Sequence, residues 1–445
     1  MAQAVDGFMP FIDNCPTAFH AVAAIKDILL DNGYEQWQEG LPLSKINAMG
    51  KKGYFYIRND SSLIAFSMPE NMRFGCDSNI TAALENVKAD ATVNALKGFR
   101  IMASHSDSPC FKIKTKPEIK VDDAYVKLNV EKYGGMILSS WLDRPLGIAG
   151  RVIIKENNAF VSKLVDFKQC AVIPNVAIHF NREINKGFEY NPQTDMLPLF
   201  SADTDVKLLE KIADILGVDS NDILGEDLYL YTDQKALKIG AEQEFLLAPR
   251  MDDLGCAYAT LNGFLDASCS EYISIYALFN NEEVGSLTGQ GADSDFARNI
   301  LKEIWNLTNS DLTFEAALRN SFLLSADNAH ALHPNHPEKS DVTNRPYLNE
   351  GVVLKFNGNA HYTTDGYSQA FVTDLCRQCG IKLQTFANRS DLPGGSTLGN
   401  IMMAHISIPA ADIGLPQLAM HSAVETAGIK DMDDMVLLAK HFYSA

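Results

Sequence analysis

The sequence predicts an α/β fold with a mixed, mostly parallel sheet that helices flank, and with a β-rich domain inserted into it. Hydrophobic runs such as 273–279 and 322–324 are typical of buried strands, and residues suited to chemistry follow each of them directly. The stretch 111–244 instead consists of short alternating runs broken by Gly and Asn. With 445 residues, the chain is long enough for two domains with substantial cores.

The first predicted element is a helix near the N-terminus. Ala18, Val22, Ile25 and Leu29 recur at helical spacing, and Gly33 marks the end of this pattern. Buried strands of the main domain are then expected at 63–66, 99–103, 273–279 and 322–324.

The main domain is predicted to be discontinuous, formed by residues 1–110 and 245–445. The insert, 111–244, contains alternating runs such as 126–130 that indicate strands, and one helix is expected at 208–215. All the candidate metal ligands lie outside the insert. We therefore expect the insert to shape access or assembly and not the metal chemistry.

The composition excludes several classes of function. The formal net charge of −18 argues against a nucleic-acid partner, because phosphate binding requires clustered Lys and Arg. The N-terminal residues show no signal-peptide pattern, and no uninterrupted apolar stretch is long enough to span a bilayer. We therefore expect a cytoplasmic protein without a membrane partner. The only CxxC pair, Cys376 and Cys379, is interpreted as structural, like the other scattered cysteines.

Candidate site residues stand at the ends of the predicted strands. These residues are His105, Asp107, Glu282, Glu283 and Asp327. Ligands of open α/β sheets bind beyond the carboxyl ends of the strands, so these side chains are expected to meet in one crevice. Asp252 and His421 are further candidates, although no clear strand precedes them. Each candidate also has a structural interpretation: Asp107 is typical of a turn cap, and His421 alone is more often structural.

Histidine and carboxylate ligands without thiolates suit zinc, manganese or cobalt. In two-metal hydrolases one carboxylate can bridge the two cations, and a further acid serves as general base. Glu282 and Glu283 must divide the duties of ligand and base. Their spacing alone does not decide which residue takes which duty.

Five ordered motifs make the chain resemble the M18 aspartyl aminopeptidases over nearly its whole length. They include His105-Ser-Asp107, Asn281-Glu282-Glu283-Val-Gly-Ser and Ser325-Ala-Asp327-Asn-Ala-His330-Ala-Leu-His333. The other two are Pro249-Arg250-Met251-Asp252-Asp253 and Gln417-Leu-Ala-Met-His421-Ser. The resemblance implies a zinc aminopeptidase-like catalytic domain and an inserted dimerisation or lid domain.

The resemblance also assigns roles at a site with two divalent metal ions. It implies that His105 and Asp327 hold one zinc, that Glu283 and His421 hold the other, and that Asp252 bridges them. Glu282 would be the general base, and Asp107 would orient the histidine ligand, because a carboxylate on the second ring nitrogen fixes the tautomer. The family more often has Asn where this chain has Asp253, which adds a charge beside the bridge.

The family removes N-terminal Asp or Glu from short peptides, so the resemblance implies a cation for the substrate side chain. Lys355 matches a family lysine near that pocket, although an exposed strand lysine is the alternative interpretation. His330, His333 and Ser396 resemble substrate-side residues, whereas the two histidines are otherwise typical of a surface loop. His179 lies in a segment that resembles the one by which a neighbouring subunit reaches the active site. Family members form tetrahedral dodecamers, and a homo-oligomer is therefore expected.

The sequence thus predicts a dinuclear metallo-aminopeptidase for peptides with an acidic N-terminal residue. Two alternatives keep the same two-metal core: a glutamyl or broad aminopeptidase, and an N-acyl amino acid deacylase. A third is a peptide-binding scaffold without turnover. The sequence speaks against the scaffold, since no expected metal or base position is missing.

Overall fold

The computed structural model describes residues 4–37, 52–69, 96–268, 271–308 and 310–445. Its largest sheet has nine strands in the order β1-β2-β3-β13-β4-β14-β18-β16-β17. Five of the eight neighbouring pairs are parallel, which confirms the predicted mixed, mostly parallel α/β fold. The strands span Tyr34–Gln36 (β1), Gly53–Arg58 (β2), Ser62–Ser67 (β3), Gly98–His105 (β4), Tyr272–Phe279 (β13), Phe322–Ala326 (β14), Val352–Phe356 (β16), Leu383–Ala387 (β17) and Ala410–Gly414 (β18).

Helices cover both faces of this sheet, because its strands carry apolar side chains on both sides. One core contains residues of α1 (Ala4–Asp13), α2 (Ala18–Asp31), α5 (Met251–Asp266), α8 (Gly366–Cys379) and α10 (Ile429–Ser444). The other contains residues of α6 (Phe296–Asn306), α7 (Phe314–Asn320) and α9 (Leu398–Ile406). The helix predicted after residue 17 is α2, whereas α1 was not predicted from the sequence. Cys376 and Cys379 both lie on α8 as free thiols.

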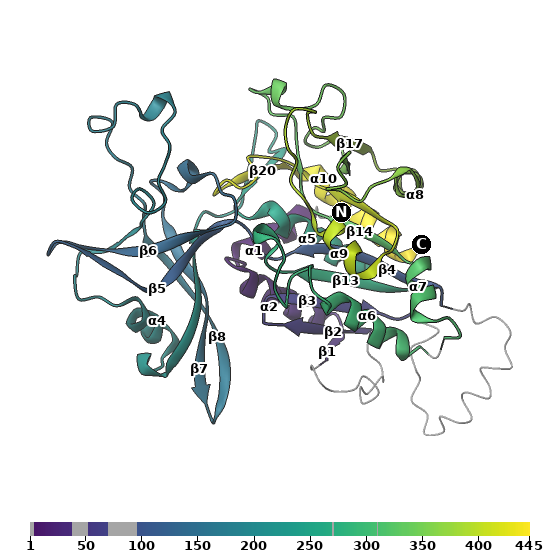
Figure 1. Ribbon diagram of the computed structural model, residues 1–445, viewed down its shortest axis with the longest axis horizontal. Coiled ribbons are helices and arrows are strands. Elements are labelled where there is room, and N and C mark those ends of the chain that lie inside the picture. Colours follow the sequence, from purple (N-terminus) through teal and green to yellow (C-terminus); the bar gives the residue numbers. More distant parts are fainter. Residues whose placement is uncertain (1–3, 38–51, 70–95, 269–270, 309) are drawn as a thin grey trace.

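The inserted part forms a separate antiparallel sheet that projects from the nine-stranded one (Figure 1). Its six strands have the order β8-β7-β10-β5-β6-β9 and surround their own apolar core, to which α4 also contributes. The predicted helix at 208–215 is confirmed as α4. The bounds are Cys110–Val121 (β5), Tyr125–Tyr133 (β6), Leu146–Glu156 (β7), Ala159–Ala171 (β8), Leu199–Ser201 (β9), Leu208–Leu216 (α4) and Ile223–Thr232 (β10).

A third sheet, which the sequence did not suggest, lies beside the other two. Its five short strands have the order β11-β12-β20-β19-β15. They span Leu237–Ile239 (β11), Phe245–Ala248 (β12), Ala329–His330 (β15), Pro416–Leu418 (β19) and Glu425–Gly428 (β20). Single 3-10 turns occur at Leu138–Trp141 (η3), Ile184–Lys186 (η4), Ser220–Asp222 (η5), Glu282–Val284 (η6) and Pro337–Lys339 (η7).

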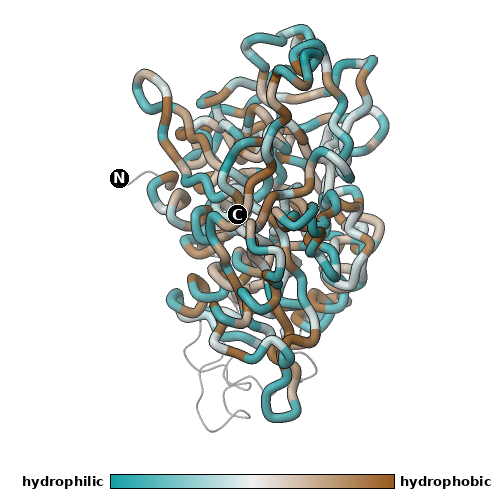
Figure 2. Tube along the Cα trace, turned by 90° about the vertical axis from the view of Figure 1, so that its left-hand side faces the viewer, coloured by the Kyte–Doolittle hydropathy of each residue, from teal (hydrophilic) through white to brown (hydrophobic). Residues whose placement is uncertain are grey.

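Hydrophobic stretches run through the interior of the molecule, while the outer loops are mostly hydrophilic (Figure 2). In the part of the chain that is described, no helix combines the length and the apolar character that crossing a membrane requires.

Candidate active site

Three adjacent parallel strands end at the same edge of the large sheet, and each delivers candidate residues there. His105 is the last residue of β4, and β4 lies between β13 and β14. Glu282 and Glu283 follow β13 within three and four residues, and Asp327 directly follows β14. The predicted gathering of these side chains at one edge of the sheet is confirmed.

The chain leaves the strand direction before the two adjacent glutamates. Asn281 adopts a left-handed conformation with φ of 64°, and Gly285 does so with φ of 97°. Asn and Gly tolerate this conformation better than other residues. The turn η6 between them lets Glu282 and Glu283 both face the cavity next to His105.

Asp252 and His421 follow short strands of the third sheet, which explains why no strand was evident before them. Asp252 stands four residues after β12, and His421 stands three residues after β19. The His421 Nε2 lies 3.4 Å from Asp252 Oδ2 and 3.4 Å from Glu283 Oε1. On the other side, the His105 Nε2 lies 3.5 Å from Asp252 Oδ1. Asp252 thus stands between the two histidines.

The ligand atoms form two groups with Asp252 in common. His105, Asp252 and Asp327 offer one set, and Asp252, Glu283 and His421 offer another; within each set the atoms lie within 4.8 Å of one another. A third overlapping set contains His105, Glu282 and Glu283. Buried carboxylates with unsatisfied oxygens are costly unless a cation or a donor compensates them. Asp252 Oδ1 and Glu283 Oε1 are such oxygens, so these residues fit a metal centre.

The protonation of the site reflects this crowding of charge. Burial, together with the Asp252 carboxylate, raises the pKa of Glu283 well above its usual value. Burial also raises the pKa of Glu282 to about 8, and Asp327 and Asp107 add to the effect. Burial lowers the pKa of His421, but Asp252 and Glu283 outweigh it and raise that pKa to about 10. The crowding of acids thus favours the protonated forms of Glu282 and Glu283.

Asp107 connects the histidine segment to the glutamate turn. Its main-chain carbonyl lies 3.0 Å from His105 Nδ1, and its Oδ1 lies 3.5 Å from the same nitrogen. Its carboxylate accepts hydrogen bonds from the amides of Glu282 and Glu283, at 3.2 and 3.3 Å. The hydroxyl of Tyr133 donates to it at 2.6 Å. Asp107 therefore orients both His105 and the two glutamates.

The insert supplies none of the candidate ligands among the described residues, but it contacts the site directly. Tyr133 ends β6 of the insert, and the carbonyl of Gly135 lies 2.6 Å from His421 Nδ1. Gly134 has φ of 77°, and a Cβ there would stand 3.1 Å from the Glu283 Cβ. The segment from Tyr133 to Gly135 thus hydrogen-bonds to Asp107 and His421 of the catalytic part and packs beside Glu283.

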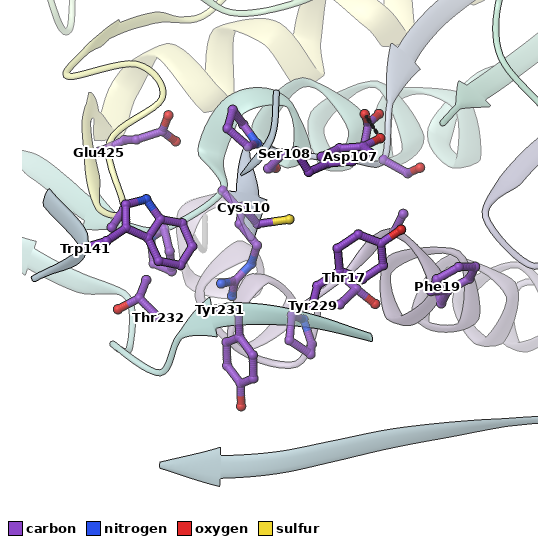
Figure 3. A pocket seen from close by; sticks show the side chains of 18 of the residues that line it. Thr17, Phe19, Asp107, Ser108, Cys110, Trp141, Tyr229, Tyr231, Thr232 and Glu425 are labelled. Carbon is purple, nitrogen blue, oxygen red and sulfur yellow. Dashed lines mark hydrogen bonds between the residues drawn. The ribbon is translucent and has the colours of Figure 1, made fainter. Parts of the chain in front are cut away.

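Glu425 is a site residue that sequence reasoning missed, because its position at the start of β20 carries no motif. Its carboxylate accepts hydrogen bonds from the amide of Asp252 at 3.1 Å and from that of His421 at 2.9 Å. It also lines a small second cavity of about 50 Å³ behind the site. Figure 3 shows this cavity with Glu425 and Trp141 on the left and with Asp107 on the right.

The cavity next to His105, the main cavity, has a volume of about 300 Å³. All the candidate ligands and the side chain of Lys355 line it. Lys355, on β16, is only 2% exposed. Its ammonium lies 3.4 Å from Asp327 Oδ2 and donates to the carbonyl of Asn328 at 2.8 Å. Burial lowers the pKa of Lys355, but Asp327 outweighs burial and raises it. The lysine is therefore a buried cation at the base of the cavity, and the alternative of an exposed strand lysine is wrong.

The family model described as Aminopeptidase I zinc metalloprotease (M18) matches residues 11–87 and 86–443. The chain belongs to the M18 aminopeptidase family. A probable M18 family aminopeptidase 2 of Clostridium acetobutylicum is 43% identical over 95% of this chain and 94% of its own length. One from Pseudomonas aeruginosa is 36% identical over 100% of this chain and 99% of its own.

Solved structures agree with this membership. The complex of Ape4 and Nbr1 contains a chain with a TM-score of 0.89 and 31% identity, which covers 99% of this chain and 85% of that one. The S. cerevisiae mApe1 dodecamer gives a TM-score of 0.83 and 27% identity, over 98% of this chain and 95% of that one. The predicted metallo-aminopeptidase class of hydrolase is thereby confirmed.

The remaining predicted site residues of this M18 aminopeptidase occupy different places. His330 and Ser396 line the main cavity. His333 lines an adjoining cavity of about 310 Å³, which has His330 in common with the first. His179 is exposed in the loop between β8 and β9 and does not line the cavity of its own chain. Asp253 is fully buried and accepts a hydrogen bond from the amide of His105 at 3.2 Å.

Proposed function

We propose that this M18 aminopeptidase removes an N-terminal acidic residue, Asp or Glu, from short peptides with the help of two divalent metal ions. The observation that carries the proposal is the position of Lys355. A buried ammonium lies in the same cavity as two overlapping ligand sets, within ion-pair distance of one of the ligands. A substrate carboxylate bound beside the site would meet this charge.

His105, Asp327 and the common Asp252 would hold one ion, and Glu283, His421 and Asp252 the other. The histidine and carboxylate donors suit zinc, in agreement with the description of the family, and also manganese or cobalt. When bound, such ions act as Lewis acids that polarise a carbonyl and lower the pKa of water. The side chain of Asp107 keeps the His105 ring oriented, because it and its carbonyl occupy the second ring nitrogen.

Glu282 would serve as the general base. It lies in the cavity beside both ligand sets, and its amide is held by Asp107. Burial raises its pKa to about 8, which brings the carboxylate into the range where it can take up a proton and release it again. It would take a proton from the attacking water and give it to the amine that leaves.

Specificity would come from Lys355. A buried ammonium favours a substrate carboxylate because leaving either charge unpaired in a desolvated pocket is costly. An apolar N-terminal residue would leave Lys355 with Asp327 and the carbonyl of Asn328 alone. His330 and Ser396 line the same cavity and would contact the N-terminal part of the peptide. His333 lines the adjoining cavity and would contact the residues that follow.

We also propose a homo-oligomer, with the tetrahedral dodecamer as its form. A related solved structure is described as a dodecamer. In this chain the loop around His179 exposes Val176, Ile178 and Phe180, and the Phe180 side chain is 88% exposed. Exposed apolar residues of this kind are typical of protein contacts. His179 would then enter the active site of a neighbouring subunit. The cytoplasmic location stays a prediction.

The proposal is tested with peptides that differ only in the N-terminal residue: Asp, Glu, Leu or acetyl-Asp. Release of that residue is measured with and without a chelator. We expect chelator-sensitive release from the free Asp and Glu peptides, about 10-fold or more above the Leu peptide, as expected for a buried charge pair. Lys355→Met is expected to lose this preference, whereas Lys382→Met, at an exposed lysine paired with Glu350, is expected to keep it.

Equal cleavage of the Leu and Asp peptides would contradict the proposed preference for an acidic N-terminal residue. The proposed metal centre would not be affected by this result. Cleavage of acetyl-Asp in preference to free Asp would instead indicate the deacylase alternative. Absence of release from every peptide, even after zinc, manganese or cobalt is added, would favour a binding protein without turnover.

A further inference from the structure

A buried acid outside the ligand set, Asp412, links two loops of the catalytic part. It lies in the middle of β18 and is fully buried. The amide and hydroxyl of Thr363 donate to its Oδ2 at 2.5 and 2.7 Å. The hydroxyl of Thr397 donates to its Oδ1 at 2.5 Å. The amide of Asp412 in turn donates to the hydroxyl of Thr364 at 3.0 Å.

The two loops that Asp412 holds both line the main cavity. Thr363 belongs to the connection between β16 and α8, which also carries Tyr362. Thr397 directly precedes α9 and follows Ser396. Tyr362, Ser396 and Thr397 all line the cavity that contains the ligand sets. One carboxylate therefore fixes two walls that come from segments more than 30 residues apart.

Asp412 also stands next to Lys355 in the sheet. The antiparallel pair β16–β18 places Val353 opposite Gly414 and Leu354 opposite Ile413. Continuing this register brings Lys355 opposite Asp412, and opposite residues point to the same face of a sheet. The carboxylate of Asp412 adds to the negative potential around the buried ammonium. The space beside it is also closed, because a Cβ at Gly399 would lie 2.9 Å from Asp412 Oδ1.

We infer that Asp412 is a positioning residue for substrate selection, which holds the Tyr362 and Thr397 walls against β18 and so sets the shape of the pocket around Lys355. It acts through the two threonines and touches no reacting atom. The inference rests on the proposed function, because it names the residue that shapes the pocket for the acidic side chain. A hydrogen bond to a charged acceptor is worth more than a neutral one, so three such bonds on one carboxylate fix the loops firmly.

The test compares Thr397→Val with Thr397→Ser and Asp412→Asn. Valine keeps the shape of threonine but removes the hydroxyl, while serine keeps the hydroxyl. We expect Thr397→Val and Asp412→Asn to raise KM for an N-terminal Asp peptide about 10-fold to 100-fold, the range expected for losing a hydrogen bond to a charged group. The value of kcat and the metal content are expected to change much less. Thr397→Ser keeps the hydroxyl and is expected to raise KM less than Thr397→Val does.

A matched control is Thr260→Val in α5. Thr260 is 1% exposed, like Thr397, but its hydroxyl bonds to Cys256 in the same helix. Thr260→Val should therefore lower the melting temperature without raising KM. If Thr397→Val likewise changes only the melting temperature, Asp412 is merely structural and the inference is overturned.

A second readout separates this inference from the proposed function. Binding of free L-aspartate, the expected product, is measured by calorimetry for the same variants. If the wild type binds aspartate but cleaves no peptide, the proposed function fails, and weaker binding by Thr397→Val still supports the role of Asp412. Unchanged affinity in Thr397→Val and Asp412→Asn overturns the inference, whatever the activity.

Discussion

At the residue scale, neighbouring side chains decide what each of two adjacent glutamates can do. Glu283 has an oxygen 3.4 Å from His421 Nε2 and belongs to the ligand set of Asp252. Glu282 lacks this contact with His421; it lines the same cavity and belongs to the overlapping set with His105 and Glu283. The spacing in the sequence left the two duties undivided, because adjacency says nothing about what lies opposite. That information comes above all from His421, which is more than a hundred positions away.

Glu282→Gln is expected to lower turnover by about 10²-fold to 10⁴-fold, the range for removing a general base. The amide fills the same space but cannot accept the proton. Metal content, measured after dialysis against zinc, is expected to equal that of the wild type. Glu283→Gln is the matched control, and it should lose metal together with activity. Turnover retained in Glu282→Gln would exclude this residue as the base.

At the scale of elements, the sequence allowed prediction of the long strands and the residues that follow them. β4, β13 and β14 have continuous apolar runs, so His105, Glu282 and Asp327 could be placed at one edge of a sheet. The strands of the third sheet have two to four residues, too few for an alternating pattern. Asp252 and His421 were therefore candidates without an evident strand before them, the resemblance to the family gave them their expected roles, and Glu425 was not found.

The first turn of α2 gives a prediction about pH. The His20 ring pairs with the Thr17 hydroxyl at 2.9 Å, and burial lowers the pKa of His20 to about 4. The unfolded chain binds the proton near pH 6.5, before the folded chain does. Stability is therefore fully present above this pH and is lost as the pH falls towards 4.

His20→Gln removes this group. Between pH 7 and pH 5 the wild type should lose about 1–2 kcal/mol more of its free energy of unfolding than the variant does, as linkage predicts for one such histidine. Urea unfolding at pH 5, 6 and 7 measures this difference. Parallel declines of both proteins would mean that His20 takes up its proton equally well in the folded chain.

At the scale of the whole molecule, the insert contacts the site of its own chain and also exposes the loop around His179. The His179 loop follows Tyr133 and Gly135, which contact the site of the same chain, by more than 40 residues. The sequence could not place this loop, because the position of a neighbouring subunit is not encoded in any local pattern. The resemblance alone suggested its role.

Mixing two inactive variants tests whether His179 serves a neighbouring subunit. His179→Gln and Glu282→Gln are each expected to lose most activity. After subunit exchange, a mixture should recover part of it, because an intact Glu282 in one subunit would meet an intact His179 from another. As a control, each variant is taken alone through the same subunit-exchange procedure. A mixture that stays as inactive as its components would place His179 outside the sites of its neighbours.

The turn Tyr133-Gly134-Gly135 has a consequence for protein engineering. This turn belongs to the insert, yet it bonds to Asp107 and His421 and leaves room for Glu283. The insert is therefore not a detachable module. A chimera that exchanges residues 111–244 for a shorter linker, in order to obtain a minimal monomeric enzyme, would remove part of the active site itself. Such a truncation must retain these three residues, or replace their hydroxyl and carbonyl groups from another part of the scaffold.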